Sequence, residues 1–509
     1  MKNMRDHLSL ANLTTLLILL WGMTIAAYAE SPSWIFAIST QGSGNSCNTG
    51  QCDDIGRSVK AGPEGNLYVT GTFSGTIQFA GTTLTSAGGL DMYLAKYTPT
   101  GELLWVIQSG GPQDDWETDV DLDDAGNLYV TGAFTGASAV FGSANGVTKT
   151  VMGGYGSTIF LAKYTPSGAL VWLQTGIIAC CAGTVNGGNA LAVDRAAGTV
   201  YIDGVTQGDI TFSSQNGASS TVSGVGTWHM ILAKFDTEGN FQWGQVNEAS
   251  PNSIPQGVAV DEMHNVYVAG WMEDQTTFSS NDGADITVAG FSPAQTTGDF
   301  PDDCFLVKYD TEGNAKWVNH IGGYKCNASK VAVSHSGEVT MGGYFGNINY
   351  GSPSEEETIV TSMPPGENRT LSDGAFTNSY TMNGILATYN TDGVLQRARR
   401  LGGDNQEAVT GLAYNQKDAL YVTGISQGPI YPQNVFVSKF CGDKRVWKRK
   451  GENAGAWIGN NTVFSPVLAV GPNGRVFVTG AYQSTAQFGT ITLNGTGAAD
   501  IFLAEVAPE

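Results

Sequence analysis

Short strands of alternating apolar and polar residues recur along almost the whole chain. One pattern is an apolar strand that ends in glycine, as in Leu67–Gly71 (LYVTG). It occurs seven times, at Leu67–Gly71, Leu128–Gly132, Val200–Gly204, Val266–Gly270, Val339–Gly343, Leu420–Gly424 and Val476–Gly480. The copies follow one another about every 68 residues, and self-similarity at a fixed period is typical of repeat architectures.

Each copy is followed by a second pattern, in which two strands flank a turn that contains glycine. The segment 91–105 (DMYLAKYTPTGELLW) is matched by 158–172 (TIFLAKYTPSGALVW) and by 229–243 (HMILAKFDTEGNFQW). A short alternating strand also precedes each copy of the first pattern. One repeat is therefore predicted to hold four antiparallel strands, a to d, with no helix between them.

The two ends of the chain complete this pattern when they are taken together. The last repeat stops after its third strand, near Ala504, and the residues Ser33–Ala37 resemble a fourth strand. Closing the repeats into a ring would leave only short, protected sheet edges. The predicted fold is all-β: a seven-bladed β-propeller of four-stranded antiparallel blades, closed by an N-terminal strand that completes the last blade.

Residues 1–29 have the features of a secretory signal peptide. Lys2 and Arg5 supply positive charge, a mostly apolar stretch follows, and Ala27–Ala29 (AYA) is a small-residue cleavage site. We expect residues 30–509 to form a single propeller domain that is secreted, periplasmic or held at the cell surface. No later run of about 18 apolar residues is present, so no membrane span is expected in this domain.

The charge balance narrows the class of partner. The chain has 25 basic and 46 acidic residues, and its formal net charge is −21. A general nucleic-acid binder needs a basic face to displace counterions from phosphates, so nucleic acid is not an expected partner. We expect a monomer that binds a protein or a glycan.

Three segments resemble a known family. They are Gly65–Gly71 (GNLYVTG), the F-x-G-x-x-L spacing at Phe79–Leu84, and the pattern D-x-x-L-A-K-Y-x-x-x-G-x-x-x-W at Asp91–Trp105. With their repeats, they are similar to bacterial secreted proteins that carry the SBBP-type β-propeller repeat. The resemblance covers nearly all of residues 31–509. It implies a scaffold and no particular activity, because fold alone does not define function.

The connections between strands b and c vary most in length. Residues 72–90 make a compact connection, whereas residues 344–382 make the longest one. In a four-stranded blade, the b–c and d–a connections leave on the same face, and binding sites concentrate on loops carried by a rigid scaffold. We therefore expect a non-catalytic binding or surface-interaction module that uses this face. The alternative is loop variation without function.

Seven cysteines are candidates for oxidation in an exported chain. Cys304 starts strand c of the fourth repeat and Cys326 lies in a d–a connection, so antiparallel pairing should bring them close enough for a disulfide. Cys47 and Cys52 are a second candidate pair. His320 is expected opposite Cys304, but two cysteines and one histidine are an incomplete ligand set for structural zinc.

The vicinal pair Cys180-Cys181 suggests an alternative function. With Asn186 and Gly187, it resembles the adjacent-cysteine element of PQQ-dependent quinoprotein alcohol dehydrogenases, in which a vicinal disulfide stacks on the cofactor. Those enzymes have eight blades, their spacing after the second cysteine differs, and their Ca²⁺ carboxylates and catalytic aspartate have no counterpart that we can place here. We expect no enzyme and no cofactor, with Ca²⁺ and PQQ left open. Cys441 is the candidate free thiol.

An acidic turn and a basic group stand out. Asp119, Asp121, Asp123 and Asp124 surround one a–b turn, but Asp124 stands where a Ca²⁺ loop has glycine. We therefore expect a solvated turn. Asp121 aligns with Lys60 of the preceding repeat, which predicts a structural ion pair between them.

Eight basic residues gather on or beside strand d of two neighbouring repeats. They are Arg397, Arg399, Arg400, Lys444, Arg445, Lys448, Arg449 and Lys450. Charged outer strands protect sheet edges against aggregation. The alternative interpretation is a binding patch for an anionic glycan or an acidic partner. No G-x-S-x-G motif or P-loop is present.

Overall fold

The structure is a computed structural model. It describes residues 33–42, 54–154, 156–178, 187–224, 228–250, 252–291, 302–322, 326–345, 357–364, 366–372, 383–402, 407–427, 433–455 and 466–507. The predicted signal peptide lies outside the described residues. Ser33–Glu509 form one compact unit. Within the described part of the chain, no helix has the length and apolar character to cross a membrane.

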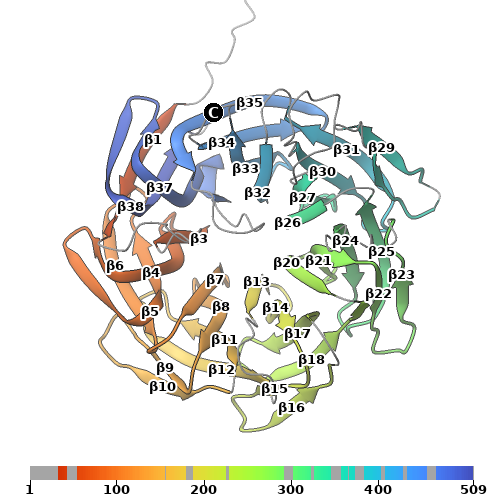
Figure 1. Ribbon diagram of the computed structural model, residues 1–509, viewed down its shortest axis with the longest axis horizontal. Coiled ribbons are helices and arrows are strands. Elements are labelled where there is room, and N and C mark those ends of the chain that lie inside the picture. The colour runs from red at the N-terminus through yellow and green to blue at the C-terminus, as the bar shows by residue number, and fades with distance from the viewer. Residues whose placement is uncertain are drawn as a thin grey trace, which may run out of the picture. The chain divides into compact units, whose positions relative to one another are not determined.

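Antiparallel strands dominate the described residues and repeat one pairing order (Figure 1). The first three sets are β3 (Ile55–Ala61), β4 (Leu67–Phe79), β5 (Thr82–Tyr97), β6 (Leu103–Gly110); β7 (Asp115–Leu122), β8 (Leu128–Thr135), β11 (Ser157–Tyr164), β12 (Leu170–Ile178); and β13 (Gly188–Asp194), β14 (Thr199–Thr206), β17 (His229–Asp236), β18 (Phe241–Val246). The next three are β20 (Ser253–Val260), β21 (Val266–Glu273), β24 (Asp302–Tyr309), β25 (Ala315–Gly322); β26 (Cys326–Val333), β27 (Val339–Phe345), β30 (Asn383–Tyr389), β31 (Leu395–Leu401); and β32 (Glu407–Tyr414), β33 (Leu420–Gln427), β34 (Gln433–Cys441), β35 (Lys444–Gly455). In each set, four strands pair in chain order.

The N-terminal strand completes a further set, as the truncated last repeat predicts. This set holds β36 (Val467–Val470), η1 (Pro472–Gly474) at its first turn, β37 (Val476–Phe488), β38 (Ile491–Val506) and β1 (Trp34–Ser39). β1 pairs antiparallel with β38, with Ala37 opposite Ala504. The first strands of the sets contact one another in the closed order β3, β7, β13, β20, β26, β32, β36 and again β3 (Figure 1). This all-β arrangement fits a β-propeller.

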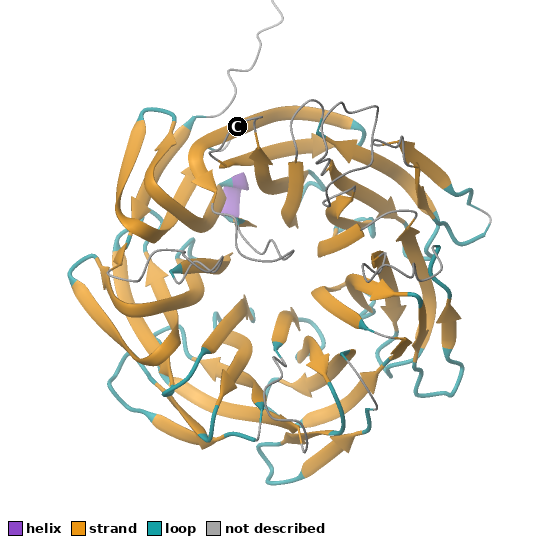
Figure 2. Cartoon of the chain, in the orientation of Figure 1, coloured by secondary structure: helices purple, strands orange, loops and turns teal. Residues whose placement is uncertain are grey.

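The variable b–c connections have a structural role that the sequence did not reveal (Figure 2). Most of them form hairpins that pair with the outer edge of the preceding set. These hairpins are β9 (Ser138–Phe141) with β10 (Lys149–Met152) on β6; β15 (Ile210–Ser213) with β16 (Ser219–Val222) on β12; β22 (Gln275–Phe278) with β23 (Ile286–Val288) on β19 (Glu248–Ser250); and β28 (Glu357–Val360) with β29 (Arg369–Ser372) on β25. The tips of β4–β5 and β37–β38 pair in the same way with β2 (Gln41–Gly42) and β35. These hairpins therefore extend each sheet and cover its edge.

The repeated lysine and tryptophan of the second sequence pattern connect neighbouring sets. Lys163 Nζ and Trp172 Nε1 both donate to the carbonyl of Thr237, at 2.9 and 3.2 Å, in the c–d turn of the next set. The Lys163 ammonium also lies 5.2 Å from the centre of the Tyr129 ring. The same pair of donors recurs in Lys234 with Trp243 on Thr311, and in Lys308 with Trp317 on Thr391. This contact explains why the motif recurs, because its lysine and tryptophan donate hydrogen bonds to the c–d turn of the next set.

The aspartate that opens the D-x-x-L-A-K pattern also has a structural role. Asp91 accepts a hydrogen bond from the backbone N–H of Ala87 at 3.0 Å, which closes the b–c hairpin on itself. Asp303 and Asp500 do the same with Phe291 and Thr496, at 2.7 and 2.8 Å. Burial raises the pKa of Asp91, and the Ala87 N–H and the Gln108 side chain partly offset that rise. These recurring carboxylates are thus hairpin caps.

Candidate functional site

Cys304 and Cys326 form a disulfide bond, with their Cα atoms 5.2 Å apart. The bond joins β24 to β26, and Cys326 is the first residue of β26 rather than part of a loop. His320 does not lie opposite Cys304, contrary to the prediction: it pairs with Phe305, and Ile321 faces the cysteine. Burial lowers the pKa of His320 to about 4. Because both sulfur atoms are used in the disulfide, this cluster offers no thiolate to a metal.

The other cysteine predictions concern a free thiol, a second disulfide and a vicinal pair. Cys441, at the end of β34, is a free and exposed thiol. The candidate pair Cys47 and Cys52 and the vicinal pair Cys180-Cys181 lie outside the described residues. The quinoprotein alternative therefore stays a prediction from the sequence.

The acidic turn is not the solvated turn that the sequence predicted, because Asp119 and Asp121 are buried and held by protein partners. Lys60 and Asp121 form the predicted ion pair, with Nζ and Oδ1 3.6 Å apart, and Arg195 lies 3.5 Å from the same oxygen. Asp123 accepts hydrogen bonds from the Asn127 backbone and side chain, both at 2.8 Å. No group of three or more metal-ligating side chains with the geometry of a metal site is found in the described part of the chain. This turn therefore acts in the fold.

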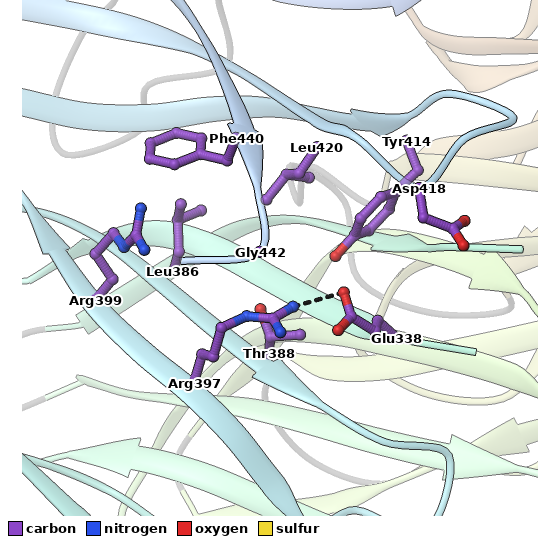
Figure 3. A pocket seen from close by; sticks show the side chains of 10 residues that line it. All are labelled: Glu338, Leu386, Thr388, Arg397, Arg399, Tyr414, Asp418, Leu420, Phe440 and Gly442. Carbon is purple, nitrogen blue, oxygen red and sulfur yellow. Dashed lines mark hydrogen bonds and ion pairs between the residues drawn. The ribbon is translucent and has the colours of Figure 1, made fainter. Parts of the chain in front are cut away.

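The predicted basic group lies on β31 and β35, where carboxylates accompany several of its members. Arg397 donates to Glu338 at 2.5 Å inside a narrow hollow, with Arg399 beside it (Figure 3). Arg399 lies 3.5 Å from the Asp443 carboxylate and 4.8 Å from the centre of the Phe440 ring. The hollow is therefore already neutralised by the protein itself.

Other basic residues of the group are paired as well. Lys448 forms an ion pair with Glu407 and covers the Phe436 ring, and Arg400 donates to Asn383 at 2.9 Å. Arg449 is half-buried, whereas Lys444, Arg445 and Lys450 are exposed. The continuous patch expected from the sequence is thus broken into paired cations and a few exposed ones.

A larger groove lies where the d–a and b–c connections meet. It has a volume of about 850 Å³ and is lined by Gly89, Pro112, Gln113, Asp114, Trp116, Thr135, Gly136, Ala137, Met152, Gly153, Gly154, Gly156 and Ser157. Met152 is 68% exposed and presents apolar surface to the groove. This groove lies on the face that the sequence analysis selected as the binding face.

Hydrogen bonds from backbone N–H groups to two carboxylates fix the walls of this groove. The Asp115 carboxylate accepts from the backbone N–H groups of Gly111 and Thr135, at 2.5 and 3.0 Å, and so ties the d–a connection to the end of β8. The neighbouring Asp114 accepts from the Leu90 N–H at 2.9 Å. Burial raises the pKa of Asp115 to about 7. The groove is therefore built on backbone that its own carboxylates hold in place.

A second cavity, of about 80 Å³, lies between the first strands of the sets. It is lined by Arg57, Ser58, Val59, Lys60, Asp119, Ala190, Leu191, Val258, Lys330, Val331, Gly411, Leu412, Val467 and Leu468. The sequence analysis missed this cluster, whose cations come from β3 and β26, far apart in the chain. A comparison of equivalent positions across the repeats would have revealed Lys330, because most of the other repeats have a small residue there.

Asp203 lies beside this cavity, and its raised pKa predicts how the stability of the fold depends on pH. Burial is the main cause that raises its pKa from 3.8 to about 8, and Oδ1 accepts the Ala190 N–H at 2.8 Å. The folded chain therefore holds this proton more tightly than the unfolded chain, so Asp203 should make stability fall as pH rises from about 4 to about 8. We expect Asp203→Asn, which keeps the Oδ1 acceptor, to flatten this part of the profile in urea unfolding measured at a series of pH values. An unchanged slope in the variant would contradict the assignment.

Comparison with known proteins supports the fold class. No known family model matches the chain. A WD repeat-containing protein of Acanthamoeba polyphaga mimivirus, L264, described as uncharacterized, is 23% identical over 343 residues, which are 57% of this chain and 24% of that protein. The chain thus spans about a quarter of the length of this curated relative. The relationship to a WD-repeat protein fits the propeller-like pairing of the strands.

Solved structures show weaker similarity. A protein of unknown function from Dyadobacter fermentans aligns with a TM-score of 0.39 and 9% identity, over 94% of this chain and 100% of that one. Virginiamycin B lyase from Staphylococcus aureus aligns with a TM-score of 0.26 and 7% identity, over 71% of this chain and 97% of that one. At this level of similarity, neither structure identifies an activity for the chain, which is similar to propeller-type repeat proteins.

Proposed function

We propose that the chain is a secreted, seven-bladed β-propeller of the SBBP type that acts as a non-catalytic binding scaffold. The closed contact order of the first strands and the pairing of β1 with β38 support seven blades and closure of the ring. The disulfide between Cys304 and Cys326 supports an oxidising location outside the cytosol. The partner is a glycan or a protein bound on the face of the b–c and d–a connections.

The groove beside Trp116 is the observation that carries this function, and its lining favours a glycan. Trp116 and Met152 offer apolar surface for a sugar ring, whereas Gln113 and Asp114 offer hydrogen-bonding groups for hydroxyls. An aromatic or apolar surface with a few fixed polar groups is typical of small-molecule and sugar sites.

Binding to a glycan array tests this function with residues 30–509. We expect Trp116→Ala to weaken binding of a captured glycan at least about fivefold, because loss of one stacking contact is worth about 1 kcal/mol or more. Trp228→Ala is the matched control, since Trp228 is 37% exposed and does not line the groove.

Circular dichroism should show both variants folded. Equal glycan binding by wild type and Trp116→Ala would contradict the groove as the site. A protein captured only by the wild-type groove, with no glycan bound, would assign the partner as a protein.

A further inference from the structure

A third cavity, of about 290 Å³, lies at the junction between the last and the first set. Residues of β1 and β38 form one side, and residues of β4, β5 and the turn after β5 form the other. Its walls are mainly apolar and include Ile38, Val69, Phe79, Tyr97, Ile501 and Leu503. A cavity of about 150 Å³ with apolar walls takes up benzene. The space at this junction is therefore large enough for one or two fused rings.

In the second, third, fourth and fifth sets, the tip of the b–c hairpin fills the corresponding space. A residue at the tip donates its backbone N–H to the glycine carbonyl in the c–d turn of the same set. These pairs are Ala144 with Gly168 at 2.8 Å, Gln215 with Gly239 at 3.1 Å, Asn281 with Gly313 at 3.2 Å, and Met363 with Gly393 at 3.1 Å. The tip also covers the glycine, because a Cβ built on Gly168 would lie 2.7 Å from the Ala144 Cβ and 3.1 Å from the Trp105 ring of the preceding set.

The first set does not have this hairpin tip, because its hairpin turns back directly after Phe79. Ala80 and Gly81 alone connect β4 to β5, and both have positive φ, at 43° and 92°. Gly101 is the equivalent glycine, and the atoms closest to a Cβ built on it all belong to Phe36 of the last set, at 3.1 to 3.5 Å. No described residue donates a hydrogen bond to the Gly101 carbonyl. The cavity thus takes the place of the hairpin tip and adjoins the acceptor that the tip uses in other sets.

We propose that this cavity binds one small, uncharged aromatic molecule that carries an N–H or O–H group, such as an indole or a phenol. Its ring packs against the apolar walls, and its N–H or O–H donates to the Gly101 carbonyl as the hairpin tip does in other sets. Because the walls belong to strands of two packed sets, the occupant is a free small molecule and not a segment of a partner protein. The described walls share no residue with the groove beside Trp116, so this site is separate from the proposed glycan function.

Calorimetric titration of residues 30–509 with indole and with 1-methylindole tests the proposal. We expect saturable binding of indole at one site per chain. 1-Methylindole has no N–H group and should bind at least about threefold more weakly, because it cannot form the hydrogen bond to Gly101. Equal affinity for the two compounds would overturn the assignment of the Gly101 carbonyl as the acceptor.

A variant that fills the cavity tests its location. Ile38→Trp places a larger side chain in the wall of the cavity and should abolish the binding of indole. Ile35→Trp is the matched control, because Ile35 lies on the same strand, is 49% exposed and does not line the cavity. This control variant should bind indole with the affinity of the wild type.

Several outcomes would overturn the proposal: no saturable binding of indole, equal affinity of Ile38→Trp and the wild type, or tighter binding of N-acetyltryptophanamide than of indole. The last result would assign the site to an aromatic side chain of a partner protein. If Ile38→Trp does not fold, a wild-type crystal soaked in 5-bromoindole decides, since the anomalous scattering of bromine either places the ring in the cavity or excludes it. Trp116→Ala should leave the binding of indole unchanged, so failure of this proposal and failure of the glycan function are distinguishable.

Discussion

Replacing Trp34 by alanine should lower the free energy of unfolding by about 3–5 kcal/mol, the usual cost of removing a buried tryptophan. Trp34 begins β1, is 9% exposed, and packs edge-on against Phe488 with ring centres 4.7 Å apart. Its Nε1 also donates to the carbonyl of Lys450, at 3.2 Å, on the neighbouring outer strand β35. One side chain therefore anchors the closing strand to two sets, and urea unfolding of residues 30–509 measures the loss.

Ile35→Ala is the control, because Ile35 is 49% exposed on the same strand. It should change the unfolding free energy by well under 1 kcal/mol, as surface substitutions usually do. If Trp34→Ala and Ile35→Ala have equal effects, the closing strand does not depend on its buried anchor.

Arg475→Ala should lower the free energy of unfolding by about 3–5 kcal/mol, because it leaves the buried carboxylate of Glu505 without its cation. Glu505 is 0% exposed and accepts from the Arg475 Nε and Nη2 groups, at 2.6 and 2.5 Å. The same guanidinium donates to the carbonyl of Pro99 at 2.7 Å. Other sets reach this turn carbonyl with the repeated lysine, as Lys96 does with Pro166 at 2.9 Å. At the junction between the last and the first set, Arg475 makes this contact in place of a lysine.

The double variant Arg475→Ala with Glu505→Lys restores the arrangement of the other repeats and should recover most of the lost stability. Glu505→Gln in the same background removes the charge without supplying the donor, so it should recover less. Lys316→Ala is the surface control, because its ion pair with Asp310 is solvent-exposed and should contribute less than about 1 kcal/mol. Chemical unfolding of the four variants tests the order, and a neutral Arg475→Ala would refute it.

The repeats made the strand order predictable, and a bulge explains the one error of register. Lys60 and Asp121 could be paired by aligning repeats, because equivalent positions of neighbouring first strands face each other. His320 was misplaced because the β24–β25 pairing shifts by one residue between Lys308 and Tyr309. Counting from the turn without this bulge puts His320 opposite Cys304, and a shift of one residue moves a side chain to the other face.

Contacts between distant segments could not be derived in this way. The pairing of the b–c hairpins with the preceding set depends on the spacing between sheets, which no local pattern encodes. The carboxylates that accompany Arg397 and Lys448 come from residues 59 and 41 positions away in the chain. Charge counting along the sequence therefore overstated the basic group. It also overlooked Lys330, which lines the cavity between the first strands together with Arg57 and Lys60 although they are far apart in the chain.

The arginine joint between the last and first repeats gives the molecule a unique seam. Three of the other described junctions use a lysine with a tryptophan and one uses a lysine alone, whereas Arg399 donates to the Asp443 carbonyl at the junction of the fifth and sixth sets. At the seam, Arg475 pairs with Glu505 and donates to Pro99, and this set of partners is found once among the described junctions. An internal repeat of a second molecule would bring a lysine without its acidic partner. We therefore expect the seam to favour self-closure over domain-swapped chains.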